Sequence, residues 1–95
     1  MKIFISGPMS GIKGYNRKEF HKAEKLLCGY GHITLNPAKL PDGLAHEEYL
    51  SICLSMIDVC DAIFMLTGWQ KSDGAVMERE YAERTGKKIM GMLEG

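Results

Sequence analysis

The chain has 95 residues, of which 45% are hydrophobic, and its 12 basic side chains balance its 12 acidic ones. This length suits a single domain with a modest core over residues 1–95. The lack of net charge argues against a protein that binds polymeric nucleic acid or a membrane surface.

No segment has the features of a membrane span or a secretory signal. No apolar run approaches the roughly 20 residues that a span requires, and the opening apolar stretch is too short for a signal peptide. Cys28, Cys53 and Cys60 are odd in number and form no CxxC pair, so we expect free thiols rather than disulfides. The histidines lack metal-binding spacing. We expect a soluble cytoplasmic protein without a metal or other cofactor.

Short apolar runs alternate along the chain with segments that carry apolar residues at helical spacing. The apolar runs predict buried strands, and the segments with helical spacing predict amphipathic helices. In chain order, the predicted elements are a strand (2–6), a helix (16–30), a strand (32–36), a helix (46–59), a strand (62–67), a helix (75–85) and a strand (87–93). This βαβαβαβ order predicts a single-domain α/β fold, a flavodoxin/Rossmann-like sandwich with a four-stranded, mostly parallel sheet.

Three predicted loops fall where such a fold binds ligands. In open α/β sheets the binding crevice lies outside the carboxyl ends of the strands. The loops that follow the first three strands cover residues 7–15, 36–44 and 68–73, and each carries glycine, proline or polar residues. We therefore expect the functional site among these loops and the helix that follows the third of them.

The helix predicted from Ala75 carries a carboxylate in an unusual place. At about 100° per residue, Glu78 falls in the middle of the apolar arc and within the first turn, whereas Glu80 and Glu83 face solvent. A charge on an apolar face is costly unless it is paired or lies in a cleft, which makes Glu78 the candidate catalytic residue. The alternative is a carboxylate that only complements the helix dipole.

Ser72, Asp73 and Gly74 precede this helix and form a candidate anion site. Either Ser72 or Asp73 can be the N-cap. Backbone N–H groups at a helix N-terminus, beside a glycine, also suit a phosphate.

Two further loops supply candidate substrate-binding residues. The first loop has two glycines, four positions apart, which allow a ligand to approach the backbone, and its candidates are Gly7, Pro8, Met9, Gly11 and Tyr15. Asn36 ends the second strand, where it either binds a ligand or makes an ordinary turn before proline. Trp69 follows the third strand, where it either stacks on a base or packs in the core or a dimer contact.

Several stretches resemble one known family over essentially the whole chain. They are "FISGPMSG…YN…F", "NPA", "CDAIFMLTGWQKSDGAVMEREYA" and "GKKI". They are similar to the nucleoside 2-deoxyribosyltransferase-like superfamily, and within it to small proteins of phages and prophages. The most specific part is the strand, the glycine-containing loop and a glutamate four residues after glycine, here Gly74 to Glu78.

The resemblance implies an N-glycosidase or deoxyribosyltransferase acting on a nucleoside or nucleoside 5′-monophosphate. Glu78 matches the glutamate that attacks the anomeric carbon of the sugar. Ser72 matches a position where transferases tend to carry aspartate and monophosphate hydrolases carry serine. The first loop would hold the sugar and phosphate, with Tyr15 or Arg17 nearby. Related proteins also complete their pockets with neighbouring subunits, so we expect a homo-oligomer.

One position departs from the family pattern. Catalytic members carry a second acidic residue where this chain has Cys53, and that residue orients the nucleophile or handles the proton of the departing base. Glu47 and Glu48 are possible substitutes on the same helix. The departure keeps a non-catalytic nucleotide-binding module open as the alternative function. A receiver-like signalling domain is disfavoured, because the first strand ends in Gly7-Pro8 rather than in acidic residues.

Overall fold

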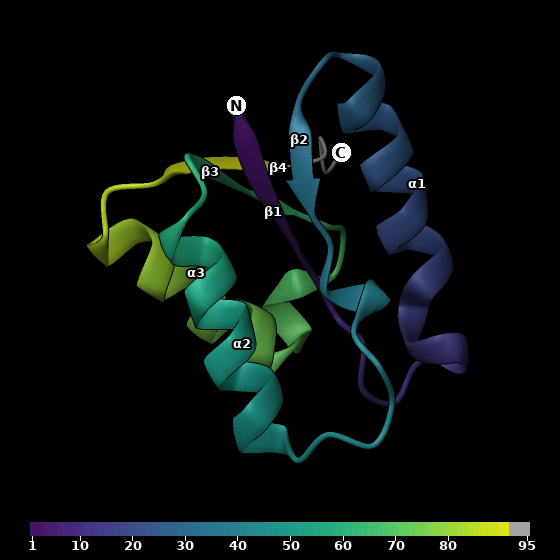
Figure 1. The fold of residues 1–95 in the computed structure, drawn as a ribbon. Coiled ribbons are helices and arrows are strands. Elements are labelled where there is room, and N and C mark those ends of the chain that lie inside the picture. The colour runs from purple at the N-terminus through teal and green to yellow at the C-terminus, as the bar shows by residue number, and fades with distance from the viewer. Residues whose placement is uncertain (92–95) are drawn as a thin grey trace.

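A computed structural model describes residues 1–91 of the chain as one α/β unit (Figure 1). Short 3-10 turns precede α1, follow β2 and precede α3, and are η1 (Lys13–Asn16), η2 (Pro37–Lys39) and η3 (Trp69–Lys71). The main elements are β1 (Lys2–Ser6), α1 (Arg17–Gly29), β2 (Ile33–Leu35), α2 (His46–Asp58), β3 (Ala62–Met65), α3 (Asp73–Arg84) and β4 (Lys88–Gly91). This order confirms the predicted βαβαβαβ fold.

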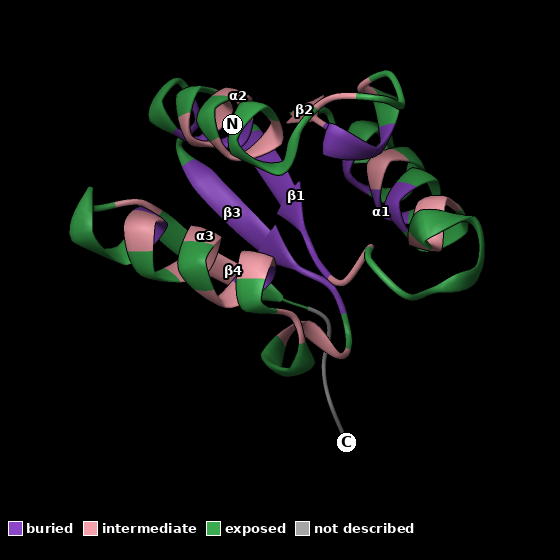
Figure 2. Cartoon of the chain, turned by 90° about the horizontal axis from the view of Figure 1, so that it is seen from below, coloured by how far each residue is buried: buried purple, intermediate pink, exposed green. Residues whose placement is uncertain are grey.

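The four strands form a sheet in the order β2-β1-β3-β4, and every neighbouring pair is parallel. In the central pair, Phe4 lies opposite Ile63 and Ser6 opposite Met65. Both central strands are covered on two faces, which explains why they read as continuous apolar runs. Figure 2 shows β1 and β3 buried between the helices.

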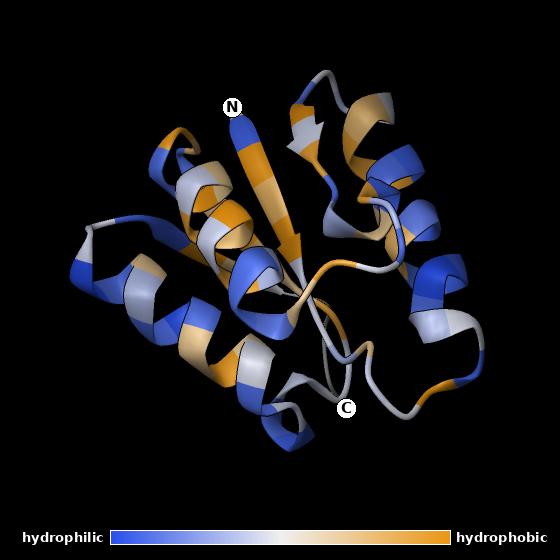
Figure 3. Cartoon of the chain, turned by 60° about the horizontal axis from the view of Figure 1, so that its bottom comes forward, coloured by the Kyte–Doolittle hydropathy of each residue, from blue (hydrophilic) through white to orange (hydrophobic). Residues whose placement is uncertain are grey.

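Helices cover both faces of the sheet. On one face, α1 packs Phe20, Ala23 and Leu27 against Ile3 and Ile5. Figure 3 shows that the apolar residues gather on the strands and on the inner faces of the helices. Full burial of a leucine, isoleucine or phenylalanine side chain stabilises the fold by about 1.5–3 kcal/mol relative to leaving it exposed.

The opposite face carries two helices. There α2 and α3 pack Cys53, Ile57, Ala75 and Ala82 against the sheet, around Phe4 and its neighbours. Both of these helices begin beside the carboxyl ends of the strands, so their first turns are available to a site at that edge (Figure 1).

Several predicted boundaries differ from the structure. The third strand ends at Met65 rather than at residue 67, and β2 ends at Leu35 because the Asn36 side chain accepts a hydrogen bond from the Ala38 N–H and starts a turn. The last strand covers Lys88–Gly91 and so begins one residue later than predicted, and residues 92–93 of its predicted range lie outside the described residues.

The third helix begins earlier than predicted. Ser72 is its N-cap, because the Ser72 hydroxyl oxygen accepts from the Ala75 N–H at 3.2 Å. The helix therefore starts at Asp73, and Glu78 lies in the second turn rather than in the first. Met77, the neighbour of Glu78, is 41% exposed and lines the cleft described below.

Candidate active site

A cleft with a volume of about 720 Å³ opens beyond the carboxyl ends of the strands. The loop after β1, the segment after β2 and the N-terminal halves of α2 and α3 form its walls. Eight residues selected from the sequence line it, namely Gly7, Pro8, Met9, Tyr15, Ser72, Asp73, Gly74 and Glu78. The cleft lies at the strand edge where the topology predicted a site.

Close backbone packing brings the first loop to this cleft. Gly7 is buried, and a Cβ atom there would lie 2.7 Å from the Cβ of Leu66. Because glycine has no side chain, it lets the backbone segments after β1 and β3 run in contact. The Asn16 side-chain amide donates to the Pro8 carbonyl at 2.9 Å, which fixes the return of the loop toward α1.

Glu78 lies on the cleft wall, where one hydroxyl group and one thiol group hold its carboxylate. The Ser6 Oγ donates to Glu78 Oε1 at 2.6 Å, and the Cys53 thiol donates to the same carboxylate. Burial raises the pKa of Glu78 to about 7, although the bonds from Ser6 and Cys53 work in the opposite direction. A carboxyl group with this pKa is divided between its two protonation states near neutral pH.

Cys53 remains protonated beside this carboxylate. Burial, together with the negative charge of Glu78 and the hydrogen bond to it, raises the pKa of the Cys53 thiol to about 12. In residues 1–91, the ion pairs join Arg17 to Asp42, Lys39 to Glu24 and Arg79 to Glu83. Glu78 is therefore held by neutral donors and not by a cation.

The cleft also contains charges of both signs. Arg17 pairs with Asp42 and lies over the ring of Tyr15, with its guanidinium carbon 5.1 Å from the ring centroid. Lys71 and Asp73 line the cleft at the N-terminus of α3. There the first backbone N–H groups of the helix lack partners within the helix, so this corner is suited to an anion.

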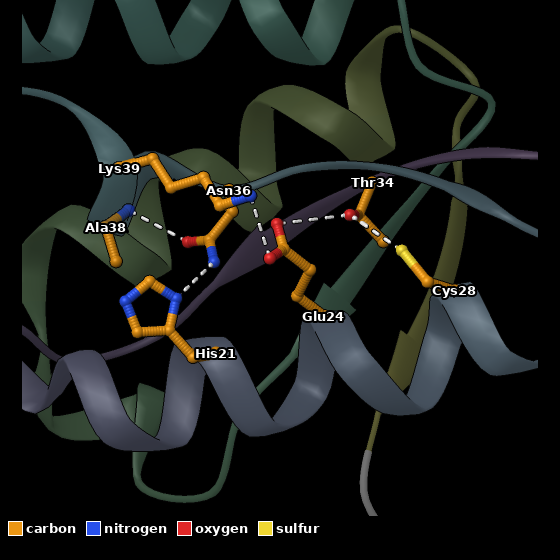
Figure 4. Close-up of polar contacts among 7 residues, drawn as sticks. All are labelled: His21, Glu24, Cys28, Thr34, Asn36, Ala38 and Lys39. Carbon is orange, nitrogen blue, oxygen red and sulfur yellow. Dashed lines mark hydrogen bonds and ion pairs between the residues drawn. The ribbon is translucent and has the colours of Figure 1, made fainter.

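Three residues selected from the sequence lie elsewhere. Gly11 is exposed outside the cleft and adopts a positive φ of 77°. Asn36 is buried and bonds to its own turn and to His21, within a polar network between α1 and the β2–η2 segment (Figure 4). Trp69 packs against the core around Phe4, and the Arg79 guanidinium lies 5.0 Å from its ring centroid. These positions match the turn and core alternatives for Asn36 and Trp69.

The possible substitute carboxylates on α2 also lie elsewhere. Glu47 and Glu48 are exposed and do not line the cleft. The Glu48 carboxylate accepts from the Ala45 N–H at 2.7 Å and so caps the start of the helix.

Sequence reasoning missed several residues of the site. Ser6 was read only as the end of a strand, although a polar residue at the carboxyl end of a buried strand is itself a signal. On α2, spacings of three and four residues place His46, Tyr49 and Leu50 on the face toward the cleft. Cys53, which the family pattern had already singled out, lies on the same face. Asp42 and Lys71 were also not selected.

Residues 1–91 contain no group of three or more His, Cys, Asp or Glu side chains that could hold a metal ion. None of the helices there is long and apolar enough to cross a bilayer.

Solved structures with the same fold include three nucleoside-related enzymes. A CMP N-glycosidase from Clostridium botulinum has a TM-score of 0.73 and 21% identity, over 96% of this chain and 70% of that one. A 2-deoxyribosyltransferase from Bacillus psychrosaccharolyticus has a TM-score of 0.76 and 23% identity, over 96% and 71%. A 2-deoxyribosyltransferase from Leishmania mexicana has a TM-score of 0.77 and 22% identity, over 96% and 63%. The resemblance to this superfamily is thus confirmed in the fold.

A search of curated proteins finds no match to the sequence. A family model does match, over residues 1–91, and its description is a domain of unknown function, DUF4406. Because this match spans nearly the whole chain, the protein belongs to the DUF4406 family.

Proposed function

We propose that the protein cleaves the N-glycosidic bond of a nucleoside 5′-monophosphate, with Glu78 as the nucleophile. The observation that carries the proposal is a partly buried carboxylate with a pKa near 7 on the wall of a cleft at the strand edge. Proteins with the same fold are a CMP N-glycosidase and 2-deoxyribosyltransferases, which favours N-glycosidic chemistry here.

The reaction would proceed through a glycosyl-enzyme. The ionised Glu78 attacks the anomeric carbon, the carbon–nitrogen bond breaks, and the base departs with the bonding electron pair and takes up a proton from solvent. Water then attacks the same carbon and gives a proton back to solvent, and the bond between that carbon and the Glu78 oxygen breaks, which releases the sugar phosphate and restores the carboxylate. If another base attacks instead of water, the outcome is transfer of the sugar rather than hydrolysis.

The phosphate would bind at the N-terminus of α3. Ser72 caps this helix, and Lys71 and Gly74 line the cleft beside it. Helix N-terminal N–H groups and a nearby ammonium group both favour a phosphate. Gly74 leaves room for the ligand to approach, because a Cβ there would have Ser72 Oγ as its nearest atom, at 3.9 Å. The base and sugar would occupy the space between the first loop and α2.

Base release from a panel of nucleosides and nucleoside 5′-monophosphates tests this proposal. We expect chromatography to detect free base from at least one monophosphate, and Glu78→Gln to abolish its release. Glu80→Gln is the matched control, because Glu80 is an exposed glutamate on the same helix. Release that survives in Glu78→Gln would overturn the assignment of the nucleophile.

A second candidate is a nucleotide-binding module without turnover. The observation that favours it is that α2 presents the Cys53 thiol, with a pKa of about 12, to Glu78, and such a thiol is a poor proton donor to a departing base. Calorimetry that detects tight binding of a monophosphate, with no base released from any member of the panel, would support this candidate.

Light scattering would test the homo-oligomer that the small core predicts.

A further inference from the structure

We propose that Ser6 is a positioning residue for Glu78 and that, together with Cys53, it forms a cradle of neutral donors which orients this carboxylate. The inference rests on the proposed role of Glu78 as a nucleophile. Ser6 acts through the Glu78 carboxylate and makes no contact with the substrate in this assignment.

The sheet fixes the position of the Ser6 hydroxyl. Ser6 ends the central strand β1, is 0% exposed and lies opposite Met65 of β3. Its carbonyl accepts from the Leu66 N–H at 2.8 Å. The hydroxyl therefore has little freedom to move, and it holds Glu78 Oε1 at 2.6 Å, a length typical of a hydroxyl donating to an ionised carboxylate.

Cys53 supplies the second donor from another element. Cys53 is 5% exposed, and its thiol donates to the Glu78 carboxylate. The carboxylate on α3 is thus held from β1 and from α2. A carboxylate has about four acceptor sites on its two oxygens, so two donors leave acceptor capacity for the reaction.

The neutrality of this cradle has a chemical consequence. A bound cation would stabilise the ionised carboxylate strongly and reduce its tendency to attack carbon. The Ser6 hydroxyl and Cys53 thiol restrict its orientation and leave its charge uncompensated. Successive side chains of a strand point to opposite faces, so the β1 residue on the face of Ser6 is Phe4, which is buried and apolar. The packing of this face therefore does not call for a hydroxyl at position 6.

A titration of Glu78 tests this role independently of turnover. The side-chain carboxyl carbon of Glu78 is followed by ¹³C NMR in protein with labelled glutamate, with Glu78→Gln to assign the signal. Removing a donor to the ionised form disfavours that form, so we expect Ser6→Ala to raise the pKa of Glu78 by about one pH unit. Cys53→Ala shifts it in the same direction. Ser55→Ala, an exposed serine on α2 outside the cleft, leaves it unchanged.

Kinetics supply the second measurement. If the protein turns over a nucleotide, Ser6→Ala lowers kcat by about 10- to 100-fold with little change in KM, and Ser6→Cys, which keeps a weaker donor, recovers part of the loss. An unchanged Glu78 titration in both Ser6→Ala and Ser6→Cys overturns the proposal. Because the titration needs no substrate, this result is distinct from a failure to find base release, which would count against the proposed function. If Ser6→Ala does not fold, Ser6→Cys gives the same test with a smaller shift.

Discussion

The thiol of Cys53 on α2 donates a hydrogen bond to the carboxylate of Glu78 on α3, within the wall of the cleft. This contact places a neutral group at the position where the family resemblance predicted a second acid. The site therefore has one carboxylate at this point, and the protonation of Glu78 does not depend on sharing a proton with a neighbouring acid. Its behaviour with pH can be predicted from burial and two donors.

The first prediction concerns activity and pH. Only the ionised form of Glu78 can attack carbon, and its pKa is about 7. We expect kcat/KM for base release to rise tenfold per pH unit below pH 7 and to level off above about pH 8. Initial rates measured from pH 5 to 9 check this. A plateau that extends down to pH 5 would contradict it.

The second prediction concerns stability and pH. Burial raises the pKa of Glu78 from 4.5 to about 7, so the folded state holds this proton more tightly than the unfolded state does. The contribution of Glu78 is therefore most favourable below pH 4.5 and is lost as the pH rises through 7, by at most roughly 3 kcal/mol.

Chemical unfolding of the wild type and Glu78→Gln isolates this effect. Because glutamine carries no charge, we expect Glu78→Gln to gain stability relative to the wild type as the pH rises from 4.5 to 8. Glu80→Gln serves as the control, since Glu80 is exposed. A constant difference between the wild type and Glu78→Gln across this range would show that the charge of Glu78 is not buried.

The third prediction introduces an acid beside Glu78. In Cys53→Asp, two carboxylates would share a buried site, and one of them would keep its proton well above its ordinary range. We expect the midpoint of the pH–activity profile to move upward by about one pH unit or more, with lower stability at pH 8 than at pH 5. Cys53→Ser, which retains a neutral donor, should keep the wild-type midpoint. A downward shift in Cys53→Asp would contradict the predicted repulsion.

The fourth prediction separates folding from binding with two glycines of the cleft. A methyl group at Gly7 would lie 2.7 Å from Leu66 Cβ, so Gly7→Ala should lower the free energy of unfolding by about 1–3 kcal/mol. Gly74 lies in helix α3 with its nearest contact at 3.9 Å, so Gly74→Ala should keep or raise stability by up to about 1 kcal/mol. It should nevertheless weaken monophosphate binding, as calorimetry would detect. Equal effects of both substitutions on stability would contradict this assignment.

The fifth prediction concerns the phosphate. Aspartate caps a helix as well as serine does, so Ser72→Asp should change stability by only a few tenths of a kcal/mol. Its negative charge should repel a phosphate and lower the preference for monophosphates over nucleosides by about tenfold or more. The ratio of kcat/KM, or of Kd, for the two substrates measures this. An unchanged ratio would mean that Ser72 does not contact the phosphate.

The strands and the position of Glu78 were predictable from the pattern of apolar residues in the sequence. Strands β1 and β3 are buried on both faces, so their apolar runs are unambiguous. In α3, helical periodicity alone separates Glu78 from Glu80. The boundaries were less predictable, because Ser72 and Asp73 are both good caps and only the three-dimensional structure distinguishes them.

Side-chain direction in the loops could not be predicted. Trp69 follows a strand at the edge of the site, but Gly68 has a positive φ of 86° and begins a turn, and the Trp69 ring packs on the core rather than in the cleft. Asn36 bonds to its own backbone turn. The Ser6–Glu78 bond depends on how α3 lies across β1, and no local pattern in the sequence encodes that placement.

The bond between Ser6 and Glu78 joins residues 72 positions apart in the chain. A partially folded chain that has formed only local structure cannot make it, because closing so long a loop requires the sheet and α3 to be docked. The carboxyl signal of Glu78 therefore reports on the docking of α3 against the sheet and not on local helix formation. The same side chain would then report both on chemistry and on the completion of folding.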